Sequence, residues 1–340
     1  MSIIISSKTS VIILPIGVVM AMISQFLFLI PSLKAKKYKY QLTWRNTEYL
    51  KQMLFLSIPI IIGGSINQIN ILVDRTIASR ITTGGIAALL YANKINLFID
   101  GIVVIPLVSV MYPKITRMFN SNKMDDLKKK VDEVIIGINL LTIPAMVGLM
   151  IFSEPLVKMI YGRGAFDFRS INMTSSALFF YAIGLLGFGL REVLARVFYS
   201  LQDTKTPMLN ATIAIILNIV LNIVLSKFMG IAGLALATSI SGIFCTILLF
   251  INLRTKFHLF NIKKITTSFL KILLASLLMG AITKLSFNYL TVNVFSQNLS
   301  LFVAIFTGII VYFYIIYFLK IDSVDTIVNA IKVKIKRNMK

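Results

Sequence analysis

A short stretch around residue 94 places charged and amide side chains inside a long apolar segment. Lys94 and Asp100 lie within residues 85–112, together with Asn93 and Asn96. A charge deep in a bilayer costs about 2.5–3.5 kcal/mol, so it normally faces a partner or a water-filled cavity. Lys94 and Asp100 are about 9 Å apart along a helix, too far for an intrahelical pair. We therefore expect separate partners. We favour a polar cavity in which Lys94 holds an anionic substrate over a lysine that extends its stem to the headgroups.

A second polar group lies in the apolar segment 53–79. Asn67, Asn70 and Asp74 follow an i, i+3, i+7 pattern, which puts them on one face of a helix. We expect this face to line a cavity. Hydrogen bonding to a neighbouring helix is the alternative, and exposure near the membrane surface would also explain Asp74. The predicted substrate-binding residues are therefore Lys94, Asn93, Asn96, Asn67, Asn70 and Asp74.

A third group of charges lies at the end of the apolar segment 172–200. Arg191, Glu192 and Arg196 precede a polar turn that contains Asp203. Glu192 and Arg196 are an i, i+4 pair of opposite charge. Charged residues at a helix end can hold two helices together at the cytoplasmic face. We therefore prefer a gating or structural role for these four residues over contact with substrate.

The remaining side chains that could do chemistry are two amides, one cysteine and one histidine. Asn218 and Asn222 share one helical face, and we expect them to bond a neighbouring helix, with a coupling-ion site as the alternative. The sequence has one cysteine, Cys245, and one histidine, His258. This composition argues against a metal site, an intrachain disulfide and a Cys–His nucleophile. With no P-loop motif either, we expect no enzyme activity and no cofactor.

The elements that position these residues are predicted from composition. Hydrophobic residues make up 57% of the 340 residues and come in runs of about 20, long enough to cross a bilayer as helices. The chain is therefore expected to be an all-α polytopic membrane protein with about nine transmembrane helices. The predicted spans are 11–31, 53–79, 85–112, 133–153, 172–200, 208–229, 231–252, 266–290 and 298–319.

The net charge of +22 is arranged in patches between these spans. Every second link is basic, so the positive-inside rule places the C-terminus in the cytoplasm and the N-terminus outside. This arrangement disfavours nucleic acid as a partner and favours anionic membrane lipids. The first apolar run is too long for a cleavable signal peptide. An external N-terminus with so little to orient it suggests that an upstream part belongs to the intact protein.

Several of these stretches together resemble the MurJ/MviN family of lipid II flippases, within the multidrug/oligosaccharidyl-lipid/polysaccharide exporter superfamily. Their order and spacing match along almost the whole chain. The stretches are 65–74, 77–79, Leu90-Tyr-Ala-Asn-Lys94, Met111-Tyr-Pro-Lys-Ile115, Tyr161-Gly-Arg-Gly-Ala-Phe166 and residues 191–207, which end in Phe198-Tyr-Ser-Leu-Gln-Asp-Thr-Lys-Thr-Pro207.

The resemblance implies a fold of fourteen helices in two lobes around a cationic cavity. The nine spans would then be helices 6–14: residues 1–52 hold the last helix of the N-terminal lobe and a basic linker, 53–252 the C-terminal lobe, 253–320 two additional helices, and 321–340 a basic tail. Lys94 would take the place of the cavity arginine in the family's Ala-Asp-Arg, and Asn93 that of its aspartate. Lysine lacks the planar fork of arginine.

The resemblance also implies a function. The family flips lipid II, the undecaprenyl-diphosphate-linked precursor, across the bacterial cytoplasmic membrane during peptidoglycan and cell-wall biosynthesis, which maintains cell shape. Because the family's first helices have no counterpart here, we expect activity to need a separately encoded N-terminal lobe. The alternatives are a flippase for another polyprenyl-linked glycan, a cation or drug antiporter, and an inactive membrane fragment.

Overall fold

A computed structural model describes residues 13–35, 48–257 and 260–319, and these residues contain α-helices and no strand. Within these ranges, eight helices are long and apolar enough to cross a membrane. They are α3 (Glu48–Ile81), α4 (Gly85–Asn120), α5 (Met124–Ile151), α7 (Phe168–Ser200), α8 (Lys205–Met229), α9 (Ile231–Phe257), α10 (Ile262–Asn293) and α11 (Gln297–Phe318). The all-α polytopic prediction is confirmed, and these eight helices contain or overlap eight of the nine predicted spans.

The chain divides into two compact units, residues 1–51 and 52–340. The first unit contains α2 (Ile13–Ala35), whose apolar stretch Pro15–Pro31 corresponds to the first predicted span. That stretch is shorter than the other candidate spans. The start of this span, most of the basic linker and the 321–340 tail lie outside the described residues.

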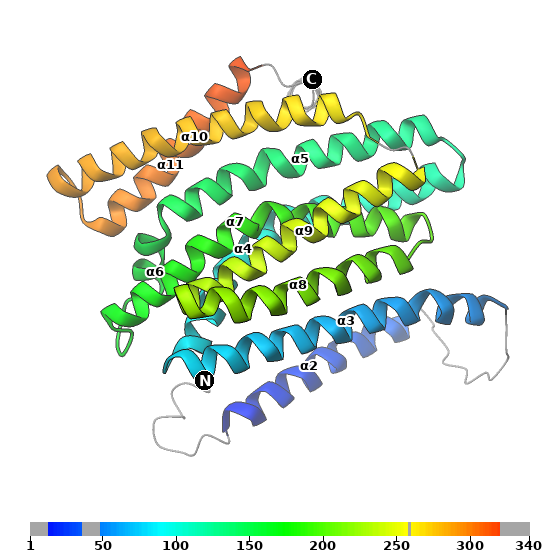
Figure 1. The fold of residues 1–340 in the computed structure, drawn as a ribbon, viewed down its shortest axis with the longest axis horizontal. Helices are drawn as coiled ribbons and strands as arrows, with labels where there is room; N and C mark the ends of the chain where they lie inside the picture. The colour runs from blue at the N-terminus through cyan, green and yellow to red at the C-terminus, as the bar shows by residue number, and fades with distance from the viewer. Residues whose placement is uncertain (1–12, 36–47, 258–259, 320–340) are drawn as a thin grey trace. The chain divides into compact units, whose positions relative to one another are not determined.

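Helix α7 forms the centre of the second unit (Figure 1). It packs against α4, α5, α6 (Ser153–Tyr161) and α9, while α8 packs against α9. Helices α10 and α11 pair with each other, and α10 also packs on α5. Helix α3 runs beside α8, where Gly63 faces Met208.

Glycines bring α7 and α9 close together. A Cβ atom at Gly187 would lie 3.0 Å from the backbone nitrogen of Ile243, and one at Gly242 would lie 2.3 Å from the ring of Phe188. Small residues allow such close contact between helices in a membrane, where packing replaces the hydrophobic effect as a driving force. The contact fixes the distance between α7 and α9.

The two ends of this bundle differ in their connections. One end, here called the Asp203 end, carries the turns 121–123 and 201–204, the end of α9 and the start of α10. The opposite end, the Gly84 end, carries the turns 82–84 and 162–167 and Gly230. Between the predicted spans 133–153 and 172–200, the structure forms the short helix α6. Val157 of α6 is fully buried, and α6 packs on α7. This packing stabilises a helix that is too short to be found from the length of apolar runs in the sequence.

Candidate functional site: a polar cavity within the bundle

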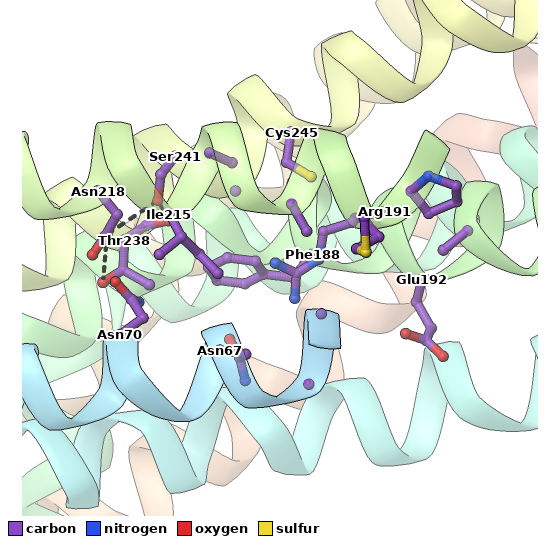
Figure 2. Close-up of a pocket in the computed structure, with 18 of the residues that line it drawn as sticks. Asn67, Asn70, Phe188, Arg191, Glu192, Ile215, Asn218, Thr238, Ser241 and Cys245 are labelled. Carbon is purple, nitrogen blue, oxygen red and sulfur yellow. Dashed lines mark hydrogen bonds between the residues drawn. The ribbon is translucent and has the colours of Figure 1, made fainter. Parts of the chain in front are cut away.

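A cavity of about 510 Å³ lies between α3, α4, α7, α8 and α9. Its wall is unusually polar for the interior of a membrane bundle, where polar side chains are rare and mark functional paths. Figure 2 shows amides at one end and charged side chains at the other. The polar lining residues are Asn67, Asn70, Asp74, Asn93, Asn96, Asp100, Tyr181, Arg191, Glu192, Tyr199, Thr204, Asn218, Thr238 and Ser241.

The polar face predicted for α3 lies on the cavity wall. Asn67, Asn70 and Asp74 all line the cavity, because their spacing keeps them on one side of the helix. On α4, Asn93 and Asn96 line the same cavity, and Asn96 is only 1% exposed. The structure therefore brings five of the six predicted substrate-binding residues together.

Lys94 is the exception. Its side chain is exposed on a different face of α4 and does not line the cavity. Its ammonium group lies over the ring of Tyr91, 5.7 Å from the centroid. The family resemblance implied that Lys94 faces a cavity between two lobes. The cavity described here does not test that expectation, so the role of Lys94 as a substrate-binding cation remains a prediction.

At the Gly84 end of the cavity, hydrogen bonds join three helices. Asn222 Nδ2 donates to Asp74 Oδ1 over 2.6 Å and to Asn218 Oδ1 over 2.8 Å. Asn218 Nδ2 in turn donates to Ser241 Oγ over 3.1 Å, and also points to Thr238 Oγ1 at 3.4 Å. This chain of amides ties α3, α8 and α9, as expected if Asn218 and Asn222 bond neighbouring helices. The carboxylate of Asp74 completes it.

Charged side chains occupy the cavity toward the Asp203 end. The guanidinium of Arg191 lies over the ring of Phe188, 5.6 Å from its centroid. Glu192 accepts a hydrogen bond from Arg196 Nε over 3.0 Å, as the i, i+4 spacing predicted. Arg191 and Glu192 line the cavity, but Arg196 lies outside its lining and over the ring of Tyr112.

Asp203 lies in the α7–α8 turn, outside the cavity lining. It accepts hydrogen bonds from the backbone nitrogen and hydroxyl of Thr206, at 3.0 and 2.7 Å, and from Lys256 Nζ at 2.8 Å. Burial alone would raise the pKa of Asp203, but the bonds from Lys256 and Thr206 outweigh it and hold the pKa below its usual value. The carboxylate thus attaches the turn to the end of α9.

Three acceptors in the lining of this cavity have no hydrogen-bond partner within the described residues. They are the buried Oδ1 atoms of Asn70, Asn96 and Asp100, and the Oδ1 of Asn222, which is outside the lining, also has none. Buried polar atoms normally have partners, so these oxygens suit water, a hard cation or a donor group of a ligand. Over the described ranges, no group of three or more His, Cys, Asp and Glu side chains could hold a metal ion.

Sequence reasoning left several lining residues out of the predicted site. Asp100 was recognised as a mid-membrane charge but was not assigned to a site, and Thr238, Ser241 and Tyr181 were not considered. Thr238 and Ser241 are three residues apart and so share a face of α9, which is the signal that would have found them. Tyr181 follows Phe179 and Phe180 in an apolar, aromatic stretch of α7 and gave no signal of its own.

Together, the spanning helices and the polar, partly charged cavity between them define a polytopic helical membrane protein with an internal polar site. Comparison with known proteins makes this specific. The family described as lipid II flippase MurJ matches residues 2–307, and the chain belongs to that family.

Three known proteins show the extent of the similarity. The chain is 36% identical over 250 residues to a probable lipid II flippase MurJ of Vibrio cholerae, covering 72% of this chain and 47% of that one. It is 30% identical over 324 residues to a probable lipid II flippase MurJ of Rickettsia prowazekii, covering 93% and 63%. A solved structure of lipid II flippase MurJ in an inward closed conformation superposes with a TM-score of 0.74 at 30% identity, covering 92% and 63%. The chain thus spans about half to two thirds of these proteins.

Proposed function

We propose that this chain forms the larger part of a lipid II flippase that works by alternating access. The observation that carries the proposal is Lys94, a cation on an exposed face of a spanning helix, next to a cavity wall built from Asn93 and Asn96. A diphosphate headgroup with attached sugars cannot cross hydrocarbon unaided. Lys94 would neutralise the diphosphate, and amides such as Asn67 and Asn70 would bond sugar or peptide, while the polyprenyl tail stays in lipid.

A second lobe completes the binding site in this proposal. Gln68 on α3 and Lys94 on α4 are exposed within their spans, where contact with lipid would be costly. We propose that a separately encoded N-terminal lobe covers them. Residues 53–252 would form the C-terminal lobe, 253–320 two added helices and 321–340 a basic tail. The division of the chain after residue 51 supports assigning 1–52 to the other lobe.

Transport would proceed without covalent chemistry. Rocking of two lobes exposes a fixed site to one side and then the other, and Arg191, Glu192, Arg196 and Asp203 lie where they could latch the Asp203 end. The energy would come from the membrane potential or an ion gradient, because the sequence contains no P-loop motif. The oxygens of Asp74, Asn218 and Asn222 are the candidate coupling-ion ligands.

The proposed location is the bacterial cytoplasmic membrane, with the C-terminus and the Asp203 end in the cytoplasm. Lys114, Arg117, Lys123 and Lys129 are exposed near that end, which supports an orientation set by the positive-inside rule. The same cations would attract anionic lipid headgroups.

Rescue of cells depleted of their own lipid II flippase tests this function. The chain would be expressed alone, with the N-terminal part of a family member, and with that part in the variants Lys94→Met and Lys284→Met. Lys284 is an exposed lysine in the spanning helix α10 and serves as the matched control. Membrane insertion of each protein is checked by immunoblot, and externally exposed lipid II is measured directly.

We expect rescue only with the added lobe, lost in Lys94→Met and kept in Lys284→Met. Rescue by the chain alone would refute the need for a second lobe. Growth without a rise in externally exposed lipid II would point to a flippase for another polyprenyl-linked glycan. No rescue in any arm, with the proteins present in the membrane, would favour an inactive fragment.

A further inference from the structure

The sequence Tyr161-Gly-Arg-Gly-Ala-Phe166 forms a tight turn between α6 and α7 that has no role in the cavity. Gly162 N donates to Lys158 O over 2.9 Å, and Phe166 N donates to Arg163 O over 3.3 Å. Gly164 has a φ of 63°, which side-chain-bearing residues seldom adopt. Asp167 then begins α7 by accepting a hydrogen bond from Ser170 N. The turn therefore points two aromatic side chains, Tyr161 and Phe166, in one direction.

Both rings pack on Tyr91 of α4. The centroid of Tyr161 lies 4.7 Å from that of Tyr91, and the centroid of Phe166 lies 5.8 Å from it in an edge-to-face contact. The hydroxyl of Tyr161 also reaches the backbone oxygen of Tyr91 at 3.4 Å. Burial raises the pKa of Tyr161, and Tyr91 adds to this effect, so the phenol stays neutral at physiological pH. Tyr91, Tyr161 and Phe166 are here called the aromatic seat.

The seat lies under the ammonium group of Lys94. Tyr91 and Lys94 are three residues apart and so share a face of α4, and the ammonium lies 5.7 Å from the ring centroid of Tyr91. Tyr91 is half-buried, whereas Lys94 is exposed. A lysine side chain is long and flexible, and attraction to the ring restricts where its charge lies.

We propose that Tyr91, braced by Tyr161 and Phe166, is a positioning residue that holds Lys94 ready for an anionic headgroup. The role in binding rests on the proposed function; the contact with Lys94 does not. The turn 161–166 would then contribute to the substrate site without touching substrate. A lysine held in one place loses less freedom on binding than a free one, which compensates in part for the missing arginine fork.

Two measurements in detergent test the proposal: the first uses the purified chain, and the second uses the chain copurified with the N-terminal part of a family member. Lysines are reductively methylated with ¹³C-formaldehyde, which keeps their charge, and the Lys94 signal is identified as the one lost in Lys94→Arg. In the second measurement, native mass spectrometry follows binding of undecaprenyl diphosphate, with uncharged undecaprenol as the control lipid. The variants are Tyr91→Leu, Tyr91→Phe and Phe166→Leu, with Tyr289→Leu, an exposed tyrosine of α10, as the matched control.

We expect an upfield ring-current shift of the Lys94 signal that Tyr91→Leu removes and Tyr91→Phe keeps. Affinity for the diphosphate should fall about two- to fivefold in Tyr91→Leu, the range of a solvent-facing cation–π contact, and less in Phe166→Leu. If Tyr91→Leu does not fold, Phe166→Leu decides through the same two readouts. An unshifted Lys94 signal, or unchanged affinity in the leucine variants, would overturn the proposal. Failure of the unaltered chain to bind the diphosphate in the presence of the N-terminal part would instead overturn the proposed function.

Discussion

Asn222 donates one hydrogen bond to Asp74 across 148 positions of sequence and another to Asn218 on its own helix. Asn222 is fully buried, and its Oδ1 has no partner within the described part of the chain. The amide therefore joins α3 to α8 while leaving an acceptor unused. Helix α3 makes few other contacts with this bundle, so the bond is a main constraint on its position.

Replacing Asn222 with alanine should loosen α3. Hydrogen bonds between membrane helices contribute about 0.6 kcal/mol on average and up to about 1.7 kcal/mol, and the loss should lie near the upper value because Asp74 is left unpaired. Thermal unfolding in detergent can be followed by a thiol-reactive dye, since Cys245 is the only cysteine and is buried. Asn298→Ala, at an exposed amide, should leave the transition in place. Equal destabilisation by Asn222→Ala and Asn298→Ala would contradict the role of Asn222 in holding α3 to α8.

Gly187→Ala should destabilise the α7–α9 contact. The added methyl would lie 3.0 Å from backbone atoms of Ile243, which cannot move as a flexible side chain would. Overpacking of this kind costs about 1–3 kcal/mol. Gly101→Ala is the control, because a methyl group there meets nothing within 4 Å, and alanine is the better helix former. In the same dye assay, the unfolding temperature should fall for Gly187→Ala and should not fall for Gly101→Ala.

The bonds to Asp203 should stabilise the chain in a pH-dependent way. Because its pKa is lowered in the folded state, the carboxylate contributes its full stabilisation above its ordinary pKa of about 3.9 and loses it as the pH falls through the lower, folded value. The difference in unfolding temperature between the unaltered chain and Asp203→Asn should thus be constant from about pH 5 to 8. It should shrink below about pH 4.

The matched control for this titration is Asp125→Asn, at an exposed position in the first turn of α5. This substitution should change stability little, because the side chain forms no ion pair among those found in the described residues. If the difference in unfolding temperature between the unaltered chain and Asp203→Asn grew as the pH falls, the folded-state pKa of Asp203 would not be lowered as stated here.

Lys94→Arg should retain or increase binding of undecaprenyl diphosphate, whereas Lys94→Met should weaken it about tenfold or more. Hydrogen bonds to charged groups contribute about 1.5–3 kcal/mol, and a guanidinium offers a fork that matches phosphate oxygens. Native mass spectrometry measures both variants, each copurified with the N-terminal part of a family member. If Lys94→Met bound undecaprenyl diphosphate as tightly as the unaltered chain, Lys94 would not be a substrate-binding residue.

The membrane spans were predictable from the sequence. The bilayer fixes the length of an apolar helix, so runs of about 20 apolar residues predicted the approximate positions of the spans, and eight of the nine predicted spans correspond to α3–α5 and α7–α11. Helical periodicity also put Asn67, Asn70 and Asp74 on one face, which the cavity wall shares. The family resemblance rested on short motifs in a constant order.

Tertiary structure alone decided which side chains meet. Periodicity gives a face but not the helix opposite it, so it could not place Asn93 and Asn96 in the cavity while leaving Lys94 on an exposed face over Tyr91. The bond between Asp203 and Lys256 joins residues 53 positions apart, and the one between Asn222 and Asp74 spans far more of the chain. Such pairings depend on how whole helices pack, and packing is set by the contacts of glycines and apolar side chains rather than by any local pattern.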